Sequence, residues 1–329
     1  MRANRGAQLS RLHVRLGLIF AIPLLLIGGS GILLGFYDGL RYGSAPYRLE
    51  RPVAHAIAPA ALAEAARSAY PAGRLEVLYL PTAPDRAARA RLTDESGSRV
   101  VVFLHPATGK PIAVRNAAER DLIGLLHGVH RGEVAGVAGE TVAAAAALSM
   151  VLLWLSGLSL RRRGSKTRRL HGRLGGGMGG VLAFIALTGG ILAFAKPLRD
   201  NLYPPPRTTG ATGLQTVDIA RVITAGSGAY TGAPLERVLF PARVGQPLTL
   251  RFLDGGRVWL DDANGEVLRT ETPYSPWINL LYPLHSGRIL GGLGPPLVAA
   301  FGALLLLLTS SGYLLLRNPS KSRISRASK

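Results

Sequence analysis

Cysteine is absent from this 329-residue chain, and acidic residues are scarce, with 19 Asp+Glu against 39 Lys+Arg. The absence of thiols excludes thiolate metal sites, iron–sulfur clusters, cysteine nucleophiles and the C-x-x-C-H attachment of c-type haem. The sequence also lacks a Walker motif, a Ser-His-Asp constellation and the metalloprotease motif H-E-x-x-H. Several common enzyme classes are thereby excluded, whereas cofactors held without a covalent bond remain open.

Four long apolar runs dominate the sequence, at residues 16–37, 134–160, 174–195 and 295–316. Each run is close to the ~20 residues that an α-helix needs to cross a bilayer. A purely soluble protein is therefore excluded. We expect four membrane spans, with the lipid bilayer as the first partner of the chain.

Most of the positive charge lies in three short segments that flank these runs. Residues 1–15, 161–173 and 317–329 hold 4, 7 and 5 Lys/Arg and no acidic residue. The positive-inside rule explains this distribution more simply than nucleic-acid binding does, so we expect cytoplasmic termini and no nucleic-acid partner. A signal peptide is the rival interpretation of residues 1–37. The apolar run is too long for one, and no small-residue cleavage pattern precedes Asp38, which favours an uncleaved first helix.

These patterns divide the chain into nine segments. In order, they are a cytoplasmic N-terminus (1–15), a first span (16–37), an outer module (38–126), an interfacial lead-in with the second span (127–160), a cytoplasmic basic loop (161–173), a third span (174–195), a second outer module (196–282), an interfacial lead-in with the fourth span (283–316) and a cytoplasmic tail (317–329).

Each outer segment predicts a small α+β module, because a helical pattern is followed by short alternating runs. The first module is expected to contain a helix at Ala60–Tyr70 and strands at Arg74–Leu80 and Arg99–Leu104. The second is expected to contain a helix at Val217–Ala225 and strands at Leu235–Phe240, Pro247–Phe252 and Arg257–Asp261.

The two halves of the chain repeat one another. The heptapeptide R-L-H-V-R-L-G at 11–17 recurs at 169–175 with six of seven positions identical, and each histidine lies 17 residues before a Ser-Gly or Thr-Gly pair. The pattern H-x-G-x3-G-x2-G begins at His130 and again at His285, each 26 residues before a Ser-Gly pair. We therefore expect an internal duplication in which helix, module and helix occur twice.

Taken together, these motifs resemble the PepSY-associated transmembrane-helix family, which includes iron-regulated membrane proteins and ferric-siderophore reductases of the bacterial inner membrane. The resemblance covers nearly the whole chain and rests on the R-L-H-x-R-L-G starts, the Leu-His dipeptides at 126–127 and 284–285, the Ser/Thr-Gly pairs and the strand–turn–Gly ends of the outer modules. It implies a four-span α-helical bundle with two PepSY-like periplasmic modules, and bound haem. Some relatives carry a fused flavin reductase domain, which nothing here resembles, so an electron donor must be a separate partner.

Histidines form two matched pairs, one at each membrane face. His13 and His171 lie on the cytoplasmic side, and His285 lies on the outer side with His130 or His127. A b-type haem needs only an axial ligand on each side of its ring, and imidazoles on facing helices supply both. We therefore expect two b-type haems stacked across the bilayer, about 25 Å apart at 1.5 Å per residue. The alternative is that these are amphipathic interfacial residues without a ligand role.

The sequence leaves the choice between His127 and His130 open. Residues at i and i+3 share one helical face, so both imidazoles can point inward. The repeat register favours His130 as the mate of His285. The Leu126-His127 dipeptide, however, matches Leu284-His285.

Arginines accompany both histidine pairs. Arg131 and Arg288, beside the outer pair, are candidates for bidentate contacts with haem propionates, because they run against the positive-inside trend. Topology alone explains the arginines beside the inner pair, at 11, 15, 169 and 173. Residues 287–294 precede two prolines and form either the first turns of the fourth helix or an interfacial hook.

Two functions of different classes follow. The first is transmembrane electron transfer from a cytoplasmic reductase or quinol, through two haems, to a periplasmic acceptor. By family resemblance that acceptor is a ferric siderophore, which would make the protein a ferric-siderophore reductase in iron uptake. The second is a haem-free, membrane-anchored sensor whose PepSY-like modules bind a peptide or protease, for example by β-addition. A transporter is a third, weaker alternative, because both halves run in the same orientation.

Overall fold

The structure is a computed structural model that describes residues 2–43, 45–116, 121–160, 165–208 and 218–317. It divides into two compact units, and each is described here by itself. The helical unit comprises residues 1–37, 122–196 and 281–329, and the sheet unit comprises residues 38–121 and 197–280. The expected outer modules, 38–126 and 196–282, end within a few residues of these divisions.

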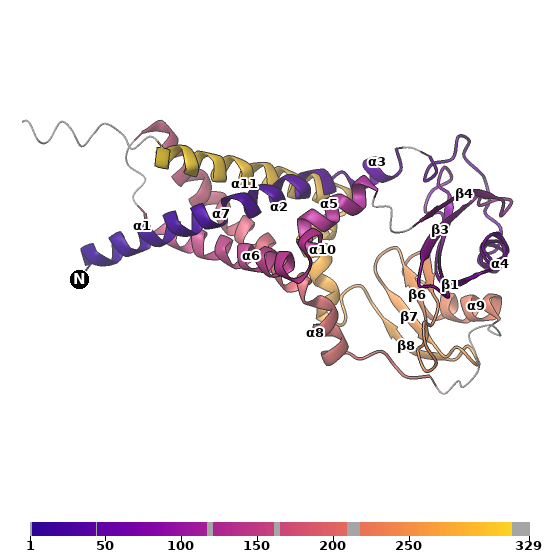
Figure 1. Cartoon of the computed structure of the whole chain (residues 1–329). Coiled ribbons are helices and arrows are strands. Elements are labelled where there is room, and N and C mark those ends of the chain that lie inside the picture. Colours follow the sequence, from indigo (N-terminus) through magenta and orange to yellow (C-terminus); the bar gives the residue numbers. More distant parts are fainter. Residues whose placement is uncertain (1, 44, 117–120, 161–164, 209–217, 318–329) are drawn as a thin grey trace, which may run out of the picture. The chain divides into compact units, whose positions relative to one another are not determined.

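Long helices make up the first unit (Figure 1). Its helices are α1 (Arg2–Ile19), α2 (Ala21–Leu34), α5 (Leu122–Arg131), α6 (Gly136–Leu158), α7 (Lys166–Ala193), α10 (Leu281–Ser286) and α11 (Gly294–Arg317). Among the described residues, three helices are long and apolar enough to cross a membrane, and α1 with α2 makes a fourth if this pair, bent by 60°, counts as one span. The protein is therefore membrane-associated, and each expected apolar run falls on one of these helices.

Small residues allow the long helices to pack closely, as is typical of membrane helices. A Cβ on Gly28 of α2 would lie 3.2 Å from the Leu306 side chain of α11. On α7, a Cβ on Gly179 or Gly180 would lie 2.8 or 3.0 Å from the indole of Trp154 on α6. The glycine-rich start of α7 thus makes room for a large aromatic ring.

The two H-x-G-x3-G-x2-G motifs form the same turn twice, so that His130 and His285 lie on the short helices α5 and α10 and do not open long spans. The turn continues through the short 3₁₀ helices η1 (Glu133–Ala135) and η3 (Arg288–Leu293) into α6 and α11. The first two glycines of each motif have positive φ, which favours glycine; they are Gly132 (80°), Gly136 (60°), Gly287 (76°) and Gly291 (65°). The third glycine, Gly139 or Gly294, has no room for a Cβ, which would overlap the carbonyl of Gly132 or Gly287. The hook interpretation of residues 287–294 therefore describes the structure.

The second unit is built on a single antiparallel sheet. In the described part of the chain its strands are β1 (Gly73–Tyr79), β2 (Ala88–Asp94), β3 (Arg99–Leu104), β4 (Pro111–Asn116), β5 (Leu235–Leu239), β6 (Leu248–Phe252), β7 (Arg257–Leu260) and β8 (Val267–Glu271). Their spatial order is β4-β3-β2-β1-β5-β6-β7-β8. The expected separate modules are thus joined, because β1 pairs with β5. Strands β2, β4 and β8 were not expected from the sequence.

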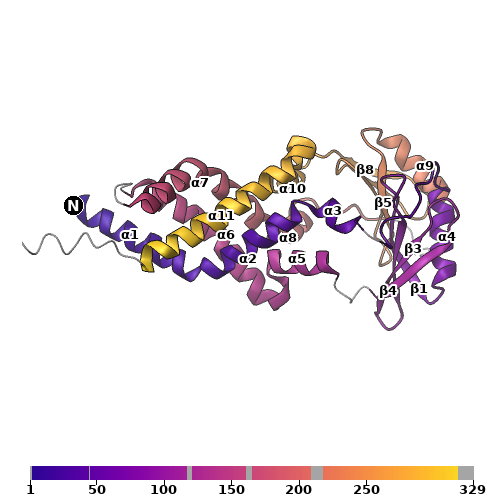
Figure 2. The same ribbon diagram turned by 90° about the horizontal axis from the view of Figure 1, so that it is seen from above.

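Helices α4 (Pro59–Ala69) and α9 (Ile219–Ala229) cover the same face of this sheet (Figure 2). Alternating strand residues such as Leu92, Val102 and Leu250 are fully buried beneath them and form one continuous core. The expected helices at 60–70 and 217–225 correspond to α4 and α9, although Val217 lies outside the described residues. The remaining short helices are α3 (Tyr37–Arg41), α8 (Ala195–Leu202) and η2 (Trp277–Leu280).

The two halves of the sheet unit share side-chain contacts as well as strand order. Tyr70 follows α4 and donates a hydrogen bond to Asp94 at 3.1 Å. Tyr230 follows α9 in the same way and donates to Asp254. In both halves, therefore, a tyrosine after the helix is hydrogen-bonded to an aspartate at or just after the end of a strand.

Candidate functional site

His13 and His171 lie side by side in the helical unit, on α1 and α7. Their ring centroids are 6.2 Å apart, and the ring planes are nearly perpendicular at 89°. The Nδ1 atom of His13 lies 3.0 Å from the hydroxyl of Ser156, and that of His171 lies 2.9 Å from the hydroxyl of Ser311. Each histidine is therefore oriented by a serine on another helix.

His130 and His285 form the second pair, on α5 and α10. Their ring centroids are 5.9 Å apart, with the planes at 50°. The Nδ1 atom of His130 lies 3.0 Å from the carbonyl oxygen of Ile27 on α2, and that of His285 lies 2.9 Å from the carbonyl oxygen of Ile185 on α7. The structure thus brings together the histidines that the repeat register matches.

The hydrogen-bond acceptors of the four imidazoles indicate that each ring has its proton on Nδ1. A carbonyl oxygen can only accept, so His130 and His285 donate from Nδ1. The hydroxyls of Ser156 and Ser311 donate to carbonyls of their own helices, Leu152 at 2.7 Å and Leu308 at 3.1 Å, so their oxygens accept from the histidines. Nε2 is then the unprotonated nitrogen in every ring, which is the tautomer of a metal-ligating histidine held by a neighbouring acceptor.

A glycine lies against each of these rings. The nearest ring atom to an added Cβ is Cε1 in all four cases, and the distances are 3.3 Å for Gly157 to His13, 3.4 Å for Gly312 to His171, 3.1 Å for Gly31 to His130 and 2.5 Å for Gly189 to His285. These glycines belong to the four Ser/Thr-Gly pairs of the repeat. Sequence reasoning used those pairs only as markers of register. In the structure the glycine of each pair leaves the space that one imidazole occupies.

The separation of the paired imidazoles matches that of two axial haem ligands. With ~2.0 Å from an imidazole nitrogen to a first-row metal and ~1.1 Å from ring centre to nitrogen, two opposed imidazoles on one metal have centroids about 6.2 Å apart. The observed separations are 6.2 and 5.9 Å. Among the described residues no group of three or more His, Cys, Asp or Glu side chains could hold a metal ion. A haem site, however, needs only two nitrogen ligands from the protein, because the macrocycle supplies the other four.

Comparison with known families agrees with this arrangement of membrane helices and sheet. The family described as the PepSY-associated TM region matches residues 10–315. The chain belongs to this family. A comparison with curated proteins finds no significant match.

His127 of this PepSY-associated protein lies apart from the second pair. Its Nδ1 donates to the carbonyl of Ile123 in its own helix at 3.0 Å, and its ring contacts Tyr37 with centroids 5.8 Å apart. The acceptor of the His127 Nδ1 proton therefore belongs to the same helix as His127. The acceptors of the four paired histidines belong to other helices.

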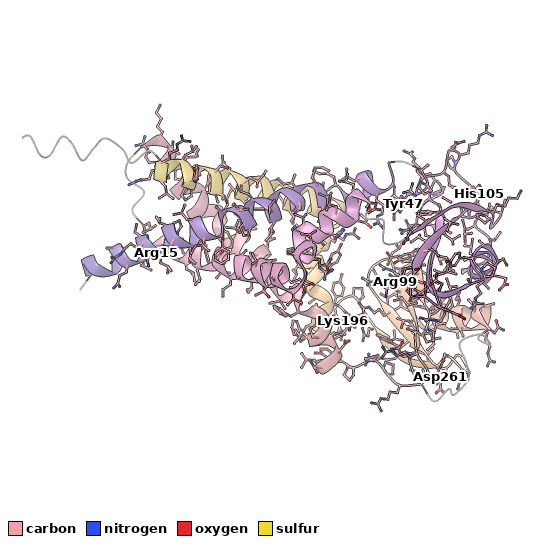
Figure 3. The ribbon with its side chains drawn as sticks, in the orientation of Figure 1. Arg15, Tyr47, Arg99, His105, Lys196 and Asp261 are labelled. Carbon is pink, nitrogen blue, oxygen red and sulfur yellow. The ribbon has the colours of Figure 1, made fainter. Side chains whose placement is uncertain are left out.

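The arginines predicted near the haem propionates have partners of other kinds. Arg131 forms a 3.0 Å ion pair with Glu133, and both side chains are largely exposed. The guanidinium of Arg288 lies 5.8 Å from the ring centre of Tyr282. Near the inner pair, Arg15 is exposed on α1 (Figure 3), as topology alone would require. None of these contacts tests the propionate hypothesis, which stays a prediction.

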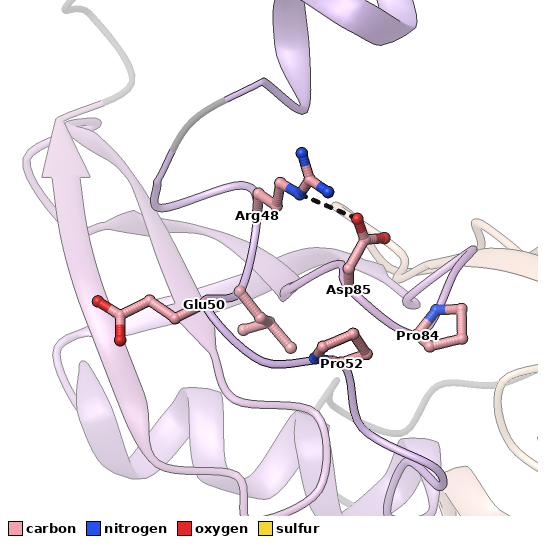
Figure 4. A pocket seen from close by; sticks show the side chains of 6 residues that line it. Arg48, Glu50, Pro52, Pro84 and Asp85 are labelled. Carbon is pink, nitrogen blue, oxygen red and sulfur yellow. Dashed lines mark ion pairs between the residues drawn. The ribbon is translucent and has the colours of Figure 1, made fainter.

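A surface hollow in the sheet unit contains none of the predicted site residues. Arg48, Leu49, Glu50, Pro52, Pro84 and Asp85 line it (Figure 4). The Arg48–Asp85 ion pair at its rim measures 3.1 Å, and the Arg48 side chain is 56% exposed. Such an open surface pair contributes little stability.

Proposed function

We propose that this protein is a b-type dihaem electron carrier of the bacterial inner membrane. In this proposal the duplicated chain crosses the membrane four times, with both termini in the cytoplasm and the sheet unit in the periplasm. One arrangement, found at all four histidines, carries the proposal. In each, Nδ1 donates a hydrogen bond to an acceptor on another helix, and the ring lies against a glycine; we call this arrangement the cradle. A histidine with a purely interfacial role needs neither contact.

Bound haem would supply a one-electron carrier at each histidine pair. The contribution of the chain is to leave Nε2 of each imidazole free as a ligand, to fix the tautomer through the Nδ1 acceptor, and to keep both pairs among apolar helices. The acceptors also tune ligand strength, because a hydrogen bond from Nδ1 makes the imidazole a stronger donor to the metal. The nearest acceptors are hydroxyls at one pair and carbonyls at the other, where the Ser30 hydroxyl also lies 3.3 Å from Nδ1 of His130, so the two sites have different surroundings. We expect them to have different midpoint potentials.

The proposed direction of transfer is from the cytoplasm or a quinol to a periplasmic ferric siderophore. One electron converts chelated Fe(III) to Fe(II), and the softer ion is held less tightly by hard oxygen ligands, which releases it for uptake. The family provides the support for this acceptor. The basic segments at 1–15, 161–173 and 317–329 provide the support for the orientation.

Electron transfer across a sealed membrane tests this function. The purified protein is reconstituted into vesicles that enclose ferric citrate and a chromogenic Fe(II) ligand, and dithionite is added outside. The proposal predicts Fe(II) formation inside at a rate that rises with protein content and falls to the protein-free rate with His13→Ala/His171→Ala. Equal rates in vesicles with the intact protein and in protein-free vesicles would refute it.

An edge strand favours the alternative function of a haem-free sensor. β4 is an edge of the sheet, and five of its six residues are exposed, including Ile112 and Val114. Such an edge can accept an extended peptide by β-addition. If the purified protein carries no haem, peptide binding at β4 becomes the leading hypothesis.

A further inference from the structure

The face of the sheet opposite α4 and α9 carries a row of arginines across three neighbouring strands. Arg237 on β5 pairs in register with Arg251 on β6, and Arg251 pairs with Arg257 on β7. Arg257 in turn lies opposite Glu271 on β8. We call Arg237, Arg251 and Arg257 the arginine row.

This row costs the fold stability. Like charges directly opposite each other on neighbouring strands are destabilising. The nearby carboxylates are shared with further arginines: Glu271 pairs with Arg199 at 2.9 Å and with Arg269 at 3.2 Å. Four arginines therefore share two glutamates, Glu236 and Glu271, and Arg257 lies beside them.

The arginines of the row differ in how closely a carboxylate approaches them. Glu236 lies 3.0 Å from Arg237 and 3.8 Å from Arg251. Arg257 forms no ion pair within 4.0 Å among the described residues, and its Nε is buried there without a hydrogen-bond partner. Burial, together with repulsion from neighbouring arginines, lowers the pKa of Arg257 to about 9. The side chain is thus still cationic at neutral pH, and Glu271, which lies opposite it on β8, is shared with Arg199 and Arg269.

The first half of the sheet shows that the fold does not require the arginine row. In the matching strand register, Val77 stands where the second half has Arg237, and Val101 stands where it has Arg257. Arg91 of that row pairs with Glu76 at 3.1 Å, and Arg115 on β4 lies opposite Val101. The same architecture therefore exists without arginines facing each other on three neighbouring strands, so the arginine row is a feature of the second half alone.

The two halves also differ in what covers this face. In the first half Phe103 is buried beneath Tyr47, with ring centroids 4.9 Å apart (Figure 3 labels Tyr47). In the second half the residue in the same register is Trp259, which is half-buried and has Arg269 5.3 Å from its ring centre. The Nε1 atom of Trp259 is buried without a partner among the described residues. It adds an uncharged N–H donor next to the arginine row.

We propose that the arginine row binds a small, multiply charged oxygen anion of the polycarboxylate class and, resting on the proposed function, that the ferric chelate reduced by this protein is anionic. Guanidinium groups present paired N–H donors that match carboxylate oxygens two at a time. A bound anion would add negative charge beside Arg257 and relieve the repulsion between arginines across β5, β6 and β7.

Calorimetry on the full-length protein in detergent tests this site, with citrate, ferric citrate and inorganic phosphate as probes. The test variant is Arg237→Val/Arg257→Val, which gives the second half the residues of the first. The control variant is Arg91→Gln. We expect citrate and ferric citrate to bind the unaltered protein, the double variant to bind about tenfold more weakly or worse, and the control to change affinity less than about twofold.

Folding of the double variant is checked by its thermal unfolding midpoint, which we expect at or above that of the unaltered protein because adjacent like charges are removed. Equal citrate affinity of the folded double variant and the unaltered protein, or no citrate binding at all, would overturn the site. Phosphate binding as tight as citrate binding would overturn the polycarboxylate class. Citrate binding without ferric citrate binding would overturn the anionic-chelate clause.

The outcome is separable from that of the haem proposal. His13→Ala/His171→Ala leaves every residue of the sheet unit unchanged, so its citrate affinity is expected to equal that of the unaltered protein. Loss of the anion site appears in calorimetry alone, whereas failure of the haem proposal appears in the optical spectrum.

Discussion

The imidazoles of His13 and His171 lie with their centres 6.2 Å apart and their planes at 89°. Because the Nδ1 atom of each is held by a serine hydroxyl, both rings keep Nε2 as the free nitrogen. His130 and His285 also pair two residues from different halves of the chain, with ring centres 5.9 Å apart and planes at 50°. The consequences of these pairings can be measured one at a time.

The serine acceptors can be removed without touching the histidines. Ser156→Ala or Ser311→Ala deletes the acceptor of Nδ1 at the inner pair, and loss of such a partner typically lowers metal-site affinity about 10- to 100-fold. We expect weaker retention of the inner haem and a shifted midpoint potential, measured by haem titration and redox potentiometry. Ser149→Ala is the matched control, because its hydroxyl donates only to Ala146 of its own helix. Unchanged potential and affinity in both acceptor variants would contradict the cradle.

Gly189 lies against the ring of His285, and its replacement tests whether the space left by this glycine is needed for haem binding. A Cβ on Gly189 would lie 2.5 Å from Cε1 and 2.9 Å from Nδ1 of this ring, so Gly189→Ala must displace it. We expect the outer haem to be lost while the inner haem is retained, as counted by pyridine haemochrome. Gly177→Ala on the same helix has no neighbour within 4 Å and should keep both haems. Two haems in Gly189→Ala would refute the role of this glycine.

The turn before α11 predicts a folding defect. In Gly294→Ala the new Cβ overlaps the carbonyl of Gly287, which should cost about 1–3 kcal/mol or more as an overpacked contact. We expect a lower thermal unfolding midpoint and a lower yield of membrane-inserted protein. Gly292→Ala, with nothing within 4 Å of its Cβ, should behave as the unaltered protein does. Equal midpoints for the two variants would contradict this account of the motif.

His127 and His130 can now be distinguished by experiment. Because His130 faces His285 and His127 faces Tyr37, His130→Ala should remove the outer haem and His127→Ala should retain it. Haem stoichiometry of the two single variants decides the question. The opposite result, with loss only in His127→Ala, would contradict this assignment.

Much of the helical unit was accessible from the sequence, because apolar runs and repeated motifs carry long-range information. The shared register of His13 with His171, and of His130 with His285, predicted pairings that lie together in the structure. Periodicity could not separate His127 from His130, since both occupy one helical face, and their partners are set by packing against α2 and α7. The role of the Ser/Thr-Gly pairs was also missed, because it depends on which helix lies opposite each histidine.

The sheet was less predictable for physical reasons. β2 reads Ala-Arg-Ala-Arg-Leu-Thr-Asp, whose buried positions are mostly alanine, and β4 begins with proline, so neither has the β-branched pattern that marks a strand. The pairing of β1 with β5 joins segments far apart in sequence and leaves no local signal. The arginine row likewise exists only in the register of three strands.

Optical spectroscopy with pyridine-haemochrome stoichiometry on the purified protein tests the central claim most directly. The account predicts two b-type haems per chain in the unaltered protein and one in each of the double variants His13→Ala/His171→Ala and His130→Ala/His285→Ala. Absence of haem after expression with ample haem supply, or two haems remaining in either double variant, would contradict it.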